Sequence, residues 1–328
     1  MSGRTRVSWN SGVQIEVKGA FNIVFDPSSR RQRWSIAFIS HGHTDHTNIL
    51  KAGGLHKVAS LPTICYYESL HGAPSPLVST CRYGQRLDLL ELRVEVLNSG
   101  HIPGSCAFLV DDDQSRILYT GDVNVMSSII QEGFKPTECD ILVMESTYAH
   151  PVFKFPPKEE VYLDILEWAA KTALSRAIPL LKCHPIGKAQ ELIALFNKHS
   201  NLPVVVDDIV FRTTKPLYKF DLLFFGSNTP EGREILKSGD CVFISSKPPV
   251  GSSLLGRPLK KAIATGWAAK YKFKSFDAAF ILSSHCDYYG LLDIVEQCSP
   301  RNVYTFHGYS KYLAVVLRRR GYRAESLI

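Results

Sequence analysis

The sequence predicts an α/β fold in which a strand-rich first part is followed by a part where strands and helices alternate. Three observations support this prediction. Up to about residue 150, short alternating or apolar segments are separated by turn residues, as in consecutive strands. From about residue 151, helical and strand-like segments follow one another, which is typical of a largely parallel sheet with helices outside it. The stretch 276–308 then gives strand, helix and strand again.

The strands of the first part are predicted from short segments. Those that alternate or are apolar span 13–19, 21–26, 35–40, 92–99, 105–112 and 115–122. A further segment, CDILVMES at 139–146, contains the continuous apolar run expected of a buried strand. Several of these strands end in polar residues, namely Asp26, His41, Asp122 and Glu145. Because α/β scaffolds place reactive side chains at strand ends, we expect a site there.

Helices are predicted in the second part at 155–177 and 185–199. The first has prolines before its first turn, acidic residues early, and apolar residues at helical spacing, namely Val161, Leu163, Ile165, Leu166 and Ala169. Strand-like segments at 178–184 and 202–208 flank the second helix. The last part places one histidine after each of its two strands, His285 and His307.

The composition permits a globular protein with a packed core. The chain has 328 residues, of which 45% are hydrophobic, and no apolar run approaches the roughly 20 residues that span a bilayer. The N-terminus lacks the apolar core of a signal peptide, so we expect a cytoplasmic protein without membrane contact. A net charge of +7 permits a polyanionic partner without identifying one. Eight cysteines without a CxxC pair argue against a thiolate zinc site.

The segment HGHTDH at 41–46 brings four potential metal ligands together: His41, His43, Asp45 and His46. The adjacent side chains of Asp45 and His46 point in different directions from His41 and His43, so one ion cannot take all four. We therefore expect two ions, with His41 and His43 on the first and Asp45 and His46 on the second.

The remaining ligands are expected after later strands. His101 in SGHIPGS and Asp122 in YTGDVN are candidates, Asp122 as a bridge between the ions, and His307 would complete the second ion. Imidazole and carboxylate ligands suit two Zn²⁺ ions first, with Mn²⁺ or iron as rivals. A two-metal site suits displacement at phosphorus or at a carbonyl. Asp26 is expected to hydrogen-bond a ligand histidine, the alternative being a simple turn.

These motifs resemble those of the metallo-β-lactamase fold superfamily, through FDPS, HGHTDH, SGHIPGS and TGDVN. Three later segments look like motifs A, B and C of the β-CASP nucleases: ILVMESTYA with Glu145, LSSHCDYYGL with His285 and YTFHG with His307. That group includes RNA 3′-end-processing endonucleases, bacterial and archaeal ribonucleases, and Artemis-like DNA repair nucleases.

Within the group, the chain looks most like exonucleases associated with DNA ligase and a helicase. The similarity lies in HPVFKFPP, HPIGKAQEL, ATGWA and HGYSKYLAVVLRRRGY. One position differs from the Artemis-like nucleases, which usually carry valine at motif C. His307 stands there, as in the RNA-acting branch, although the ligase-associated proteins also keep a histidine. The choice between DNA and RNA therefore stays open.

The resemblance implies an αββα metallo-β-lactamase sandwich with an inserted βα β-CASP domain. Residues 1–150 and 281–328 would form the catalytic core and 151–280 the insertion, with the site in the cleft between them. The implied activity is that of a zinc-dependent nuclease, with exonuclease action on DNA in repair favoured and RNA 3′-end processing or decay as the alternative. Implied partners are nucleic acid, DNA ligase and a helicase. A thioester or lactam hydrolase and an inactive binding subunit are less favoured.

The hypothesis for the reaction is that the ions, held by ligands that include Asp45 and Asp122, activate a water molecule for in-line attack on phosphorus. His285 is the candidate acid for the leaving oxygen, with Glu145 orienting it and favouring its protonated form.

Substrate contacts are expected from the second part of the chain. The helix start in HPIGKAQEL could hold a phosphate through its backbone N–H groups and Lys188, the alternative being a glycine turn packed on the sheet. His184 and Ser284 are further candidates for the cleft. The basic segment LRRRGYR at 317–323 is expected to be solvated.

Overall fold

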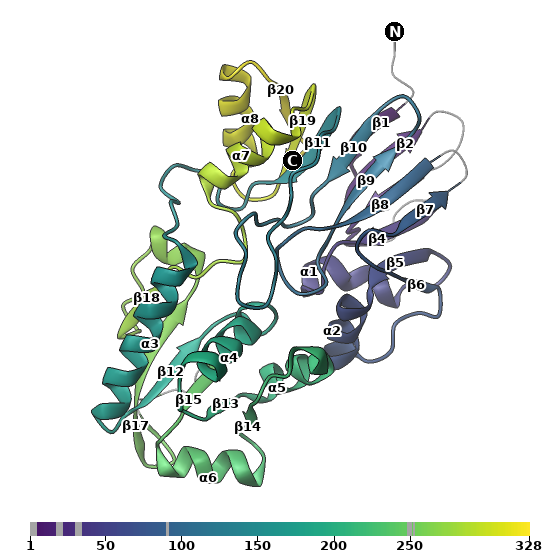
Figure 1. The fold of residues 1–328 in the computed structure, drawn as a ribbon. Helices are drawn as coiled ribbons and strands as arrows, with labels where there is room; N and C mark the ends of the chain where they lie inside the picture. The colour runs from purple at the N-terminus through teal and green to yellow at the C-terminus, as the bar shows by residue number, and fades with distance from the viewer. Residues whose placement is uncertain (1–4, 18–21, 30–34, 90–91, 248–250, 252) are drawn as a thin grey trace. The chain divides into compact units, whose positions relative to one another are not determined.

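The computed structural model describes residues 5–17, 22–29, 35–89, 92–247, 251 and 253–328 (Figure 1). The chain forms two compact units. Unit 1 comprises Met1–Ser127, Glu132–Pro151 and His285–Ile328, and unit 2 comprises Ser128–Gln131 and Val152–Ser284. Within the described residues, no helix is both long and apolar enough to cross a membrane. All eight cysteines are free thiols, and seven of them are buried.

Unit 1 begins with a six-stranded sheet in the order β1-β2-β3-β4-β5-β6. Its strands are β1 (Thr5–Trp9), β2 (Val13–Val17), β3 (Asn22–Phe25), β4 (Ile36–Ile39), β5 (His56–Ser60) and β6 (Val78–Cys81). The first three strands are antiparallel and the pairs from β3 to β6 are parallel. The apolar face that holds Val24, Ala37 and Ile39 packs against Ile49, Leu50 and Ile64.

The second sheet of unit 1 has seven strands in the order β20-β19-β11-β10-β9-β8-β7. They are β7 (Arg86–Leu89), β8 (Leu92–Asn98), β9 (Cys106–Asp111), β10 (Arg116–Tyr119), β11 (Ile141–Glu145), β19 (Asn302–Phe306) and β20 (Arg323–Ser326). β11 and β19 are parallel, with Glu145 opposite Phe306. This pairing joins two segments that are about half the chain apart in sequence.

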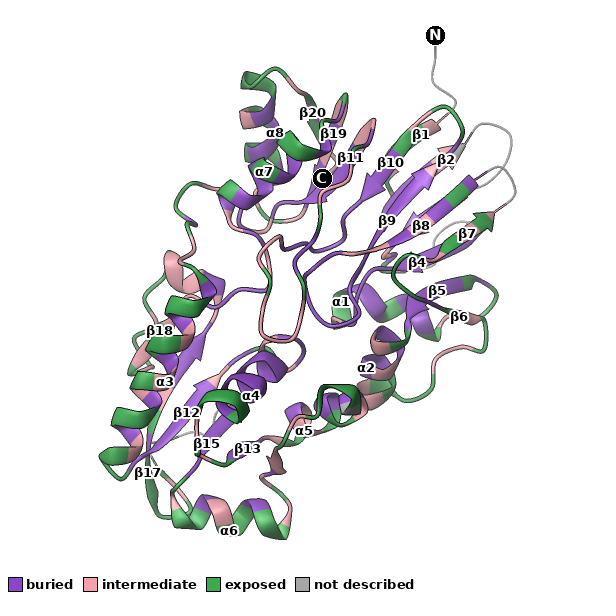
Figure 2. Ribbon diagram, in the orientation of Figure 1, coloured by how far each residue is buried: buried purple, intermediate pink, exposed green. Residues whose placement is uncertain are grey.

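The two sheets of unit 1 pack face to face. One apolar cluster contains Ile15 and Phe38 of the first sheet together with Phe108 and Val143 of the second. Helices cover both outer faces: α1 (Thr44–Thr47), η1 (Asn48–Lys51) and α2 (Leu61–His71) on the first, α7 (Tyr288–Cys298) and α8 (Ser310–Arg319) on the second. Figure 2 shows the resulting buried strands between half-exposed helices. The predicted αββα sandwich is confirmed.

Unit 2 is a βα unit around its own sheet, in the order β14-β13-β15-β12-β17-β16 with β18 beside β17. The strands are β12 (Ile178–Lys182), β13 (Val204–Val206), β14 (Phe225–Gly226), β15 (Val242–Ser245), β16 (Ser253–Leu254), β17 (Arg257–Ala264) and β18 (Ala278–Phe280). The helices are α3 (Lys158–Leu174), α4 (Lys188–His199), α5 (Asp208–Thr214), η2 (Lys215–Phe220), α6 (Pro230–Ser238) and η3 (Gly266–Ala269). Every pair except β16–β17 is parallel, as the alternating pattern predicts.

The helices of unit 2 are shorter than predicted. α3 begins at Lys158 because prolines precede it, and α4 begins at Lys188 because Gly187 adopts a left-handed φ of 87°. Leu163 does not share the buried face of α3, since it is 67% exposed while Val161 and Ile165 are buried. Leu163 lies two residues from each of them, which turns it about 200° round the helix and away from the sheet.

Candidate metal centre and catalytic site

The candidate ligands of unit 1 follow the carboxyl ends of its strands. His41 and His43 come after β4, His101 after β8, and Asp122 after β10. His307 comes directly after β19. Strand pairing in each sheet sets these ends side by side, so residues far apart in sequence meet at one edge of the sandwich.

Four of these side chains form a group with the dimensions of a zinc site. The distance is 3.1 Å from His41 Nε2 to His43 Nδ1 and 3.3 Å from His43 Nδ1 to His101 Nε2. Asp122 Oδ2 lies 3.4 Å from His41 Nε2 and 3.7 Å from His101 Nε2. Ligands about 2.0–2.1 Å from a tetrahedral zinc ion are separated by roughly 3.3–3.4 Å, so the group fits one ion.

A second group shares Asp122 with the first. One ligand atom each of His46, Asp122 and His307 lies within 4.8 Å of the others. Asp122 Oδ1 is buried and accepts no hydrogen bond from the described residues, although buried carboxylate oxygens are normally satisfied. A bridging carboxylate between two ions would satisfy it. Asp45 is 78% exposed, and its Oδ2 lies 3.6 Å from His46 Nε2, beside this group.

Asp26 fixes the orientation of His46. Its Oδ2 lies 2.8 Å from His46 Nδ1 and accepts hydrogen bonds from the hydroxyls of Tyr119 and Ser40. Its Oδ1 accepts from the Ser40 amide at 2.7 Å. With Nδ1 engaged by a carboxylate, His46 presents Nε2 to the second group. The sequence did not reveal Tyr119 and Ser40 as partners, although Ser40 directly precedes His41 and Tyr119 lies three residues before Asp122.

Buried Glu145 and partly exposed His285 form a pair next to the first group. Glu145 Oε1 lies 2.8 Å from His285 Nδ1 and accepts from the Val123 amide, while Oε2 accepts from the Thr147 amide. The ring centroids of His285 and His101 are 4.4 Å apart. Burial alone would raise the pKa of Glu145, but His285 and the two amides outweigh it and lower the pKa to about 2.

The pKa values of the candidate ligands are shifted in different directions by burial and by neighbouring charges. Burial lowers the pKa of His41 well below its ordinary value, and the neighbouring histidines lower it further. His41 is therefore neutral, the form that binds metals. Burial also lowers the pKa of His46, but Asp26 and Asp122 outweigh it and raise that pKa to about 10. Burial and Glu145 raise the pKa of Asp122.

The loop that carries His307 is held by Ser146, a residue that sequence reasoning missed. The Ser146 hydroxyl lies 2.7 Å from the carbonyl oxygens of both Phe306 and His307, and the Ser146 carbonyl accepts from the Tyr309 amide. His307 itself has a left-handed φ of 60°. Ser146 directly follows Glu145 at the end of β11, the strand that pairs with β19, and this position is the signal that could have identified it.

The three candidates for substrate contact belong to unit 2. Lys188 is the first residue of α4, and His184 Nδ1 lies 3.0 Å from the Ile186 carbonyl. The Gly187 amide at this helix start already donates to the side chain of Gln190 at 2.6 Å. Ser284 is buried. Their contacts with phosphate stay predictions.

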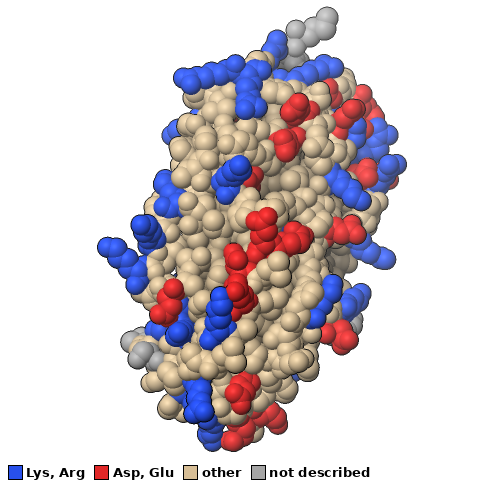
Figure 3. All heavy atoms as spheres, turned by 60° about the vertical axis from the view of Figure 1, so that its left-hand side comes forward, with Lys and Arg blue, Asp and Glu red and all other residues tan. Residues whose placement is uncertain are grey.

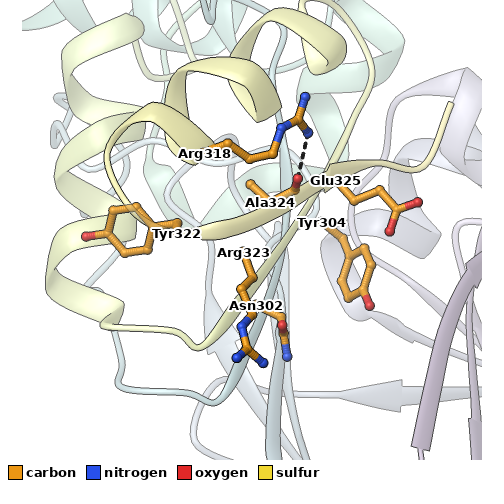
Figure 4. Close-up of a pocket in the computed structure, with 7 residues that line it drawn as sticks. All are labelled: Asn302, Tyr304, Arg318, Tyr322, Arg323, Ala324 and Glu325. Atoms are coloured by element: carbon orange, nitrogen blue, oxygen red, sulfur yellow. Dashed lines mark hydrogen bonds between the residues drawn. The ribbon is translucent and has the colours of Figure 1, made fainter.

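The segment LRRRGYR lies at the opposite end of β19 from His307. A pocket there of about 470 Å³ is lined by Asn302, Tyr304, Arg318, Tyr322, Arg323, Ala324 and Glu325 (Figure 4). Arg318 donates to the Ala324 carbonyl at 2.7 Å and so ties α8 to the outermost strand, β20. Lys and Arg are spread among Asp and Glu over the face shown in Figure 3, without one dominant basic patch there.

Several known proteins are similar to this chain in sequence. No protein-family model matches the chain. A "Probable DNA ligase" of Opitutus terrae is 30% identical over 89% of this chain, and an "RNase J-like protein" of Methanocaldococcus jannaschii is 24% identical over 54%. "Protein artemis" of Gallus gallus is 24% identical over 85% of this chain. Two of these relatives bear the names of β-CASP nucleases.

Homologues of this chain include nucleases of the β-CASP family, which have the metallo-β-lactamase fold. The chain spans 28% of the Opitutus terrae relative, 48% of the Methanocaldococcus jannaschii relative and 45% of the Gallus gallus relative. Among solved structures, a protein of unknown function from Enterococcus faecalis aligns with a TM-score of 0.69 over 94% of this chain and 95% of its own, at 13% identity. That likeness supports the fold.

Proposed function

We propose that this chain is a metal-dependent nuclease that hydrolyses phosphodiester bonds, with DNA as the favoured polymer. One observation carries the proposal. A four-ligand group of zinc dimensions lies against the Glu145–His285 pair, so candidate metal ligands and a candidate proton donor share one site.

Two ions fit the donors that unit 1 supplies. His41, His43, His101 and Asp122 would hold the first, and His46, Asp122 and His307 the second, with Asp45 beside it. The donors are imidazole and carboxylate, which suits Zn²⁺ first and Mn²⁺ second. When bound, such ions act as Lewis acids that favour ionisation of water and stabilise charge on phosphate oxygens.

The residues of the chain supply the proton chemistry. Glu145 is ionised and engages Nδ1 of His285, so the proton that His285 passes on is the one on Nε2. A protonated His285 would donate it to the oxygen that leaves phosphorus, and Glu145 would stabilise the charged imidazole. Asp26 keeps His46 in the orientation that the second group needs.

Unit 2 is proposed to be the β-CASP insertion. Its bounds, Val152–Ser284, lie close to the 151–280 expected from the resemblance. Lys188, His184 and Ser284 are the residues proposed to contact the substrate from this unit.

The share of the chain that each relative covers favours DNA. The matches to the relative named as a DNA ligase and to Artemis cover 89% and 85% of this chain, whereas the match to the RNase J-like protein covers 54%. We therefore favour exonuclease action in DNA repair, with a DNA ligase and a helicase as partners and the cytoplasm as location. RNA processing is the second candidate, because histidine stands at position 307.

One experiment tests the proposal and ranks the polymers. Single- and double-stranded DNA and RNA, labelled at either end, are incubated with the chain and Zn²⁺ or Mn²⁺, with a thioester as a parallel substrate. We expect DNA to be cleaved fastest. Predominant RNA cleavage would favour the second candidate, and thioester turnover alone would overturn the nuclease proposal.

His285→Ala tests the proton donor in the same assay. Loss of a general acid lowers turnover by about 10²–10⁴-fold. The metal content, measured by atomic absorption, should stay at the wild-type value. If metal content falls together with activity, His285 is a ligand and the assigned role is wrong.

A further inference from the structure

A pocket of about 190 Å³ in unit 1 is lined in part by Trp9, Ser11 and Ser28, which have no part in the hydrolysis proposed above. It lies beside the second ligand group, since His46 and His307 are among the residues that line it. Sites for drug-sized ligands enclose about 300–1,000 Å³, so this pocket suits one small group. Because ions on the ligand groups are proposed to stabilise charge on phosphate oxygens, a group in this pocket would lie close to the phosphate that is cut.

The wall of the pocket is a series of aromatic rings that ends at the surface. Phe25 and Tyr119 are stacked with centroids 4.6 Å apart, and Tyr119 and Phe306 are stacked at 5.5 Å. Trp9 continues the series, 6.3 Å from Phe306, and lies at the end of β1. The three inner rings are fully buried, whereas Trp9 is 37% exposed. A large, exposed aromatic side chain beside a cavity offers a face for stacking.

The backbone around the pocket adopts unusual conformations. Three residues that line it, Ser11, Asp26 and His307, have left-handed φ values of 58°, 46° and 60°. Such values are uncommon for residues other than glycine and concentrate at functional sites, where surrounding structure enforces them. Each of the three comes from a different loop. The surrounding structure therefore fixes the backbone that lines the pocket.

The charge of the pocket argues against a phosphate as its occupant. Two carboxylates, Asp26 and Asp45, line it, and there is no Lys or Arg among the described residues around it. Ionised carboxylates only accept hydrogen bonds, so neither Asp26 nor Asp45 offers a phosphate a donor. An uncharged planar ring with N–H donors would find an aromatic face and oxygen acceptors, including the exposed Asp45 and Ser28.

We propose that this pocket binds one unpaired nucleobase of the strand being cut, stacked against Trp9. The inference rests on the proposed nuclease function and narrows its substrate. A base that is paired and stacked in a duplex cannot enter, so the enzyme acts on single strands or on ends that have separated. Trp9 is then a residue that positions the strand relative to the metal centre.

The test measures binding without cleavage. The full chain, loaded with Zn²⁺, is titrated against a short phosphorothioate single-stranded DNA that carries fluorescent 2-aminopurine at one position at a time. Wild type should quench the fluorescence at one position far more than at the others. Trp9→Ala should lose that quenching and weaken binding by about 5- to 100-fold, the range of one base–aromatic stack.

Three further variants separate stacking from other effects. Trp9→Phe should retain most of the affinity, and Trp9→Leu, which has no aromatic face, should bind like Trp9→Ala. Tyr83→Ala removes an exposed aromatic of unit 1 that lies outside the pocket and should bind like wild type. Zinc content is measured for each protein. Equal binding by Trp9→Leu and Trp9→Phe, or by Trp9→Ala and wild type, would overturn the proposal.

The two proposals fail in different ways. Cleavage of DNA or RNA with no position-specific quenching would leave the nuclease function standing and remove the base pocket. A chain that neither cleaves nor binds any of the labelled nucleic acids would refute the nuclease function, and the base pocket with it.

Discussion

Glu145 is almost completely buried, yet it stays ionised because three donors face its two oxygens. The amides of Val123 and Thr147 come from the backbone and do not titrate, and His285 supplies the third contact. Since two of the three donors are fixed by the fold, the carboxylate keeps its place whatever the protonation state of His285. A fixed carboxylate of this kind would hold His285 in the same orientation each time it donates a proton in the proposed reaction.

The lowered pKa of Glu145 predicts how the metal-free chain responds to acid. The carboxylate has an ordinary pKa of 4.5 and a folded pKa of about 2, so its contribution to stability is complete above pH 4.5 and is lost as pH falls towards 2. Glu145→Gln cannot ionise. In urea unfolding of chelator-treated protein, the stability difference between wild type and Glu145→Gln should therefore shrink between pH 5 and pH 3. A difference independent of pH would contradict the assignment.

Replacing Asp26 should weaken metal binding at the second group. Asp26→Asn removes the carboxylate that engages Nδ1 of His46, and loss of such a partner typically lowers metal affinity by about 10–100-fold. Competition with a fluorescent zinc chelator measures the effect. Asp112→Asn is the matched control, because Asp112 is also a buried, hydrogen-bonded carboxylate but lies outside every ligand group. Equal losses in both variants would mean that the effect is general destabilisation.

At the scale of the elements, the pairing of β11 with β19 builds the site. The register that sets Glu145 opposite Phe306 brings motif A against His307, and Ser146 connects the two strand ends through the carbonyls of residues 306 and 307. Because the two strands are parallel, both of their carboxyl ends point to the same edge. The metal ligands and the acid pair therefore share one edge of the sandwich.

Ser146→Ala should loosen the loop of His307. The Phe306 carbonyl loses its hydroxyl donor and the His307 carbonyl keeps only the Ser310 amide, which costs about 1–3 kcal/mol in the free energy of unfolding. Zinc stoichiometry should fall towards one ion, since His307 belongs to the second group only. Ser238→Ala, which removes a hydroxyl hydrogen bond at the exposed end of α6, is the control and should change neither quantity. Full occupancy of both ions in Ser146→Ala would contradict this role.

The sequence predicts most strands of unit 1 but misses β5 for a physical reason. Lys57 interrupts the pattern of HKVAS, yet its side chain is completely buried and donates to the Ala52 carbonyl. A charged residue is not expected at a core position, so this segment resembles a loop in the sequence. β6 and β7 were missed because they lie at sheet edges, where alternate residues face solvent and only a few apolar positions remain.

The candidate site was easier to propose from the sequence than the contacts that support it. The candidate metal ligands occur in dense motifs with chemistry that few other patterns share, so HGHTDH could be singled out directly. Ser146, Tyr119 and Ser40 are ordinary residue types, and their roles depend on pairing between distant strands. The pocket beside Trp9 likewise depends on three loops that only the fold brings together.

At the scale of the whole molecule, the two units have separate apolar cores, and the donors assigned to the ions all belong to unit 1. A bound ion stabilises only the unit that holds it. Calorimetry should therefore resolve two transitions, of which chelation lowers one by several degrees and leaves the other in place. Re-addition of Zn²⁺ should restore the first. A single transition that shifts as a whole would show that the units unfold together.

The pairing of β11 with β19 also affects when the protein becomes active during its synthesis. β11 leaves the ribosome early, but its partner follows only after the whole of unit 2 has been made. The acid pair and the second ligand group thus remain incomplete in a nascent chain until His285 and His307, which follow unit 2 in the sequence, have been made. The proposed nuclease activity, including any action on the protein's own messenger, therefore cannot appear before residue 307 has been synthesised.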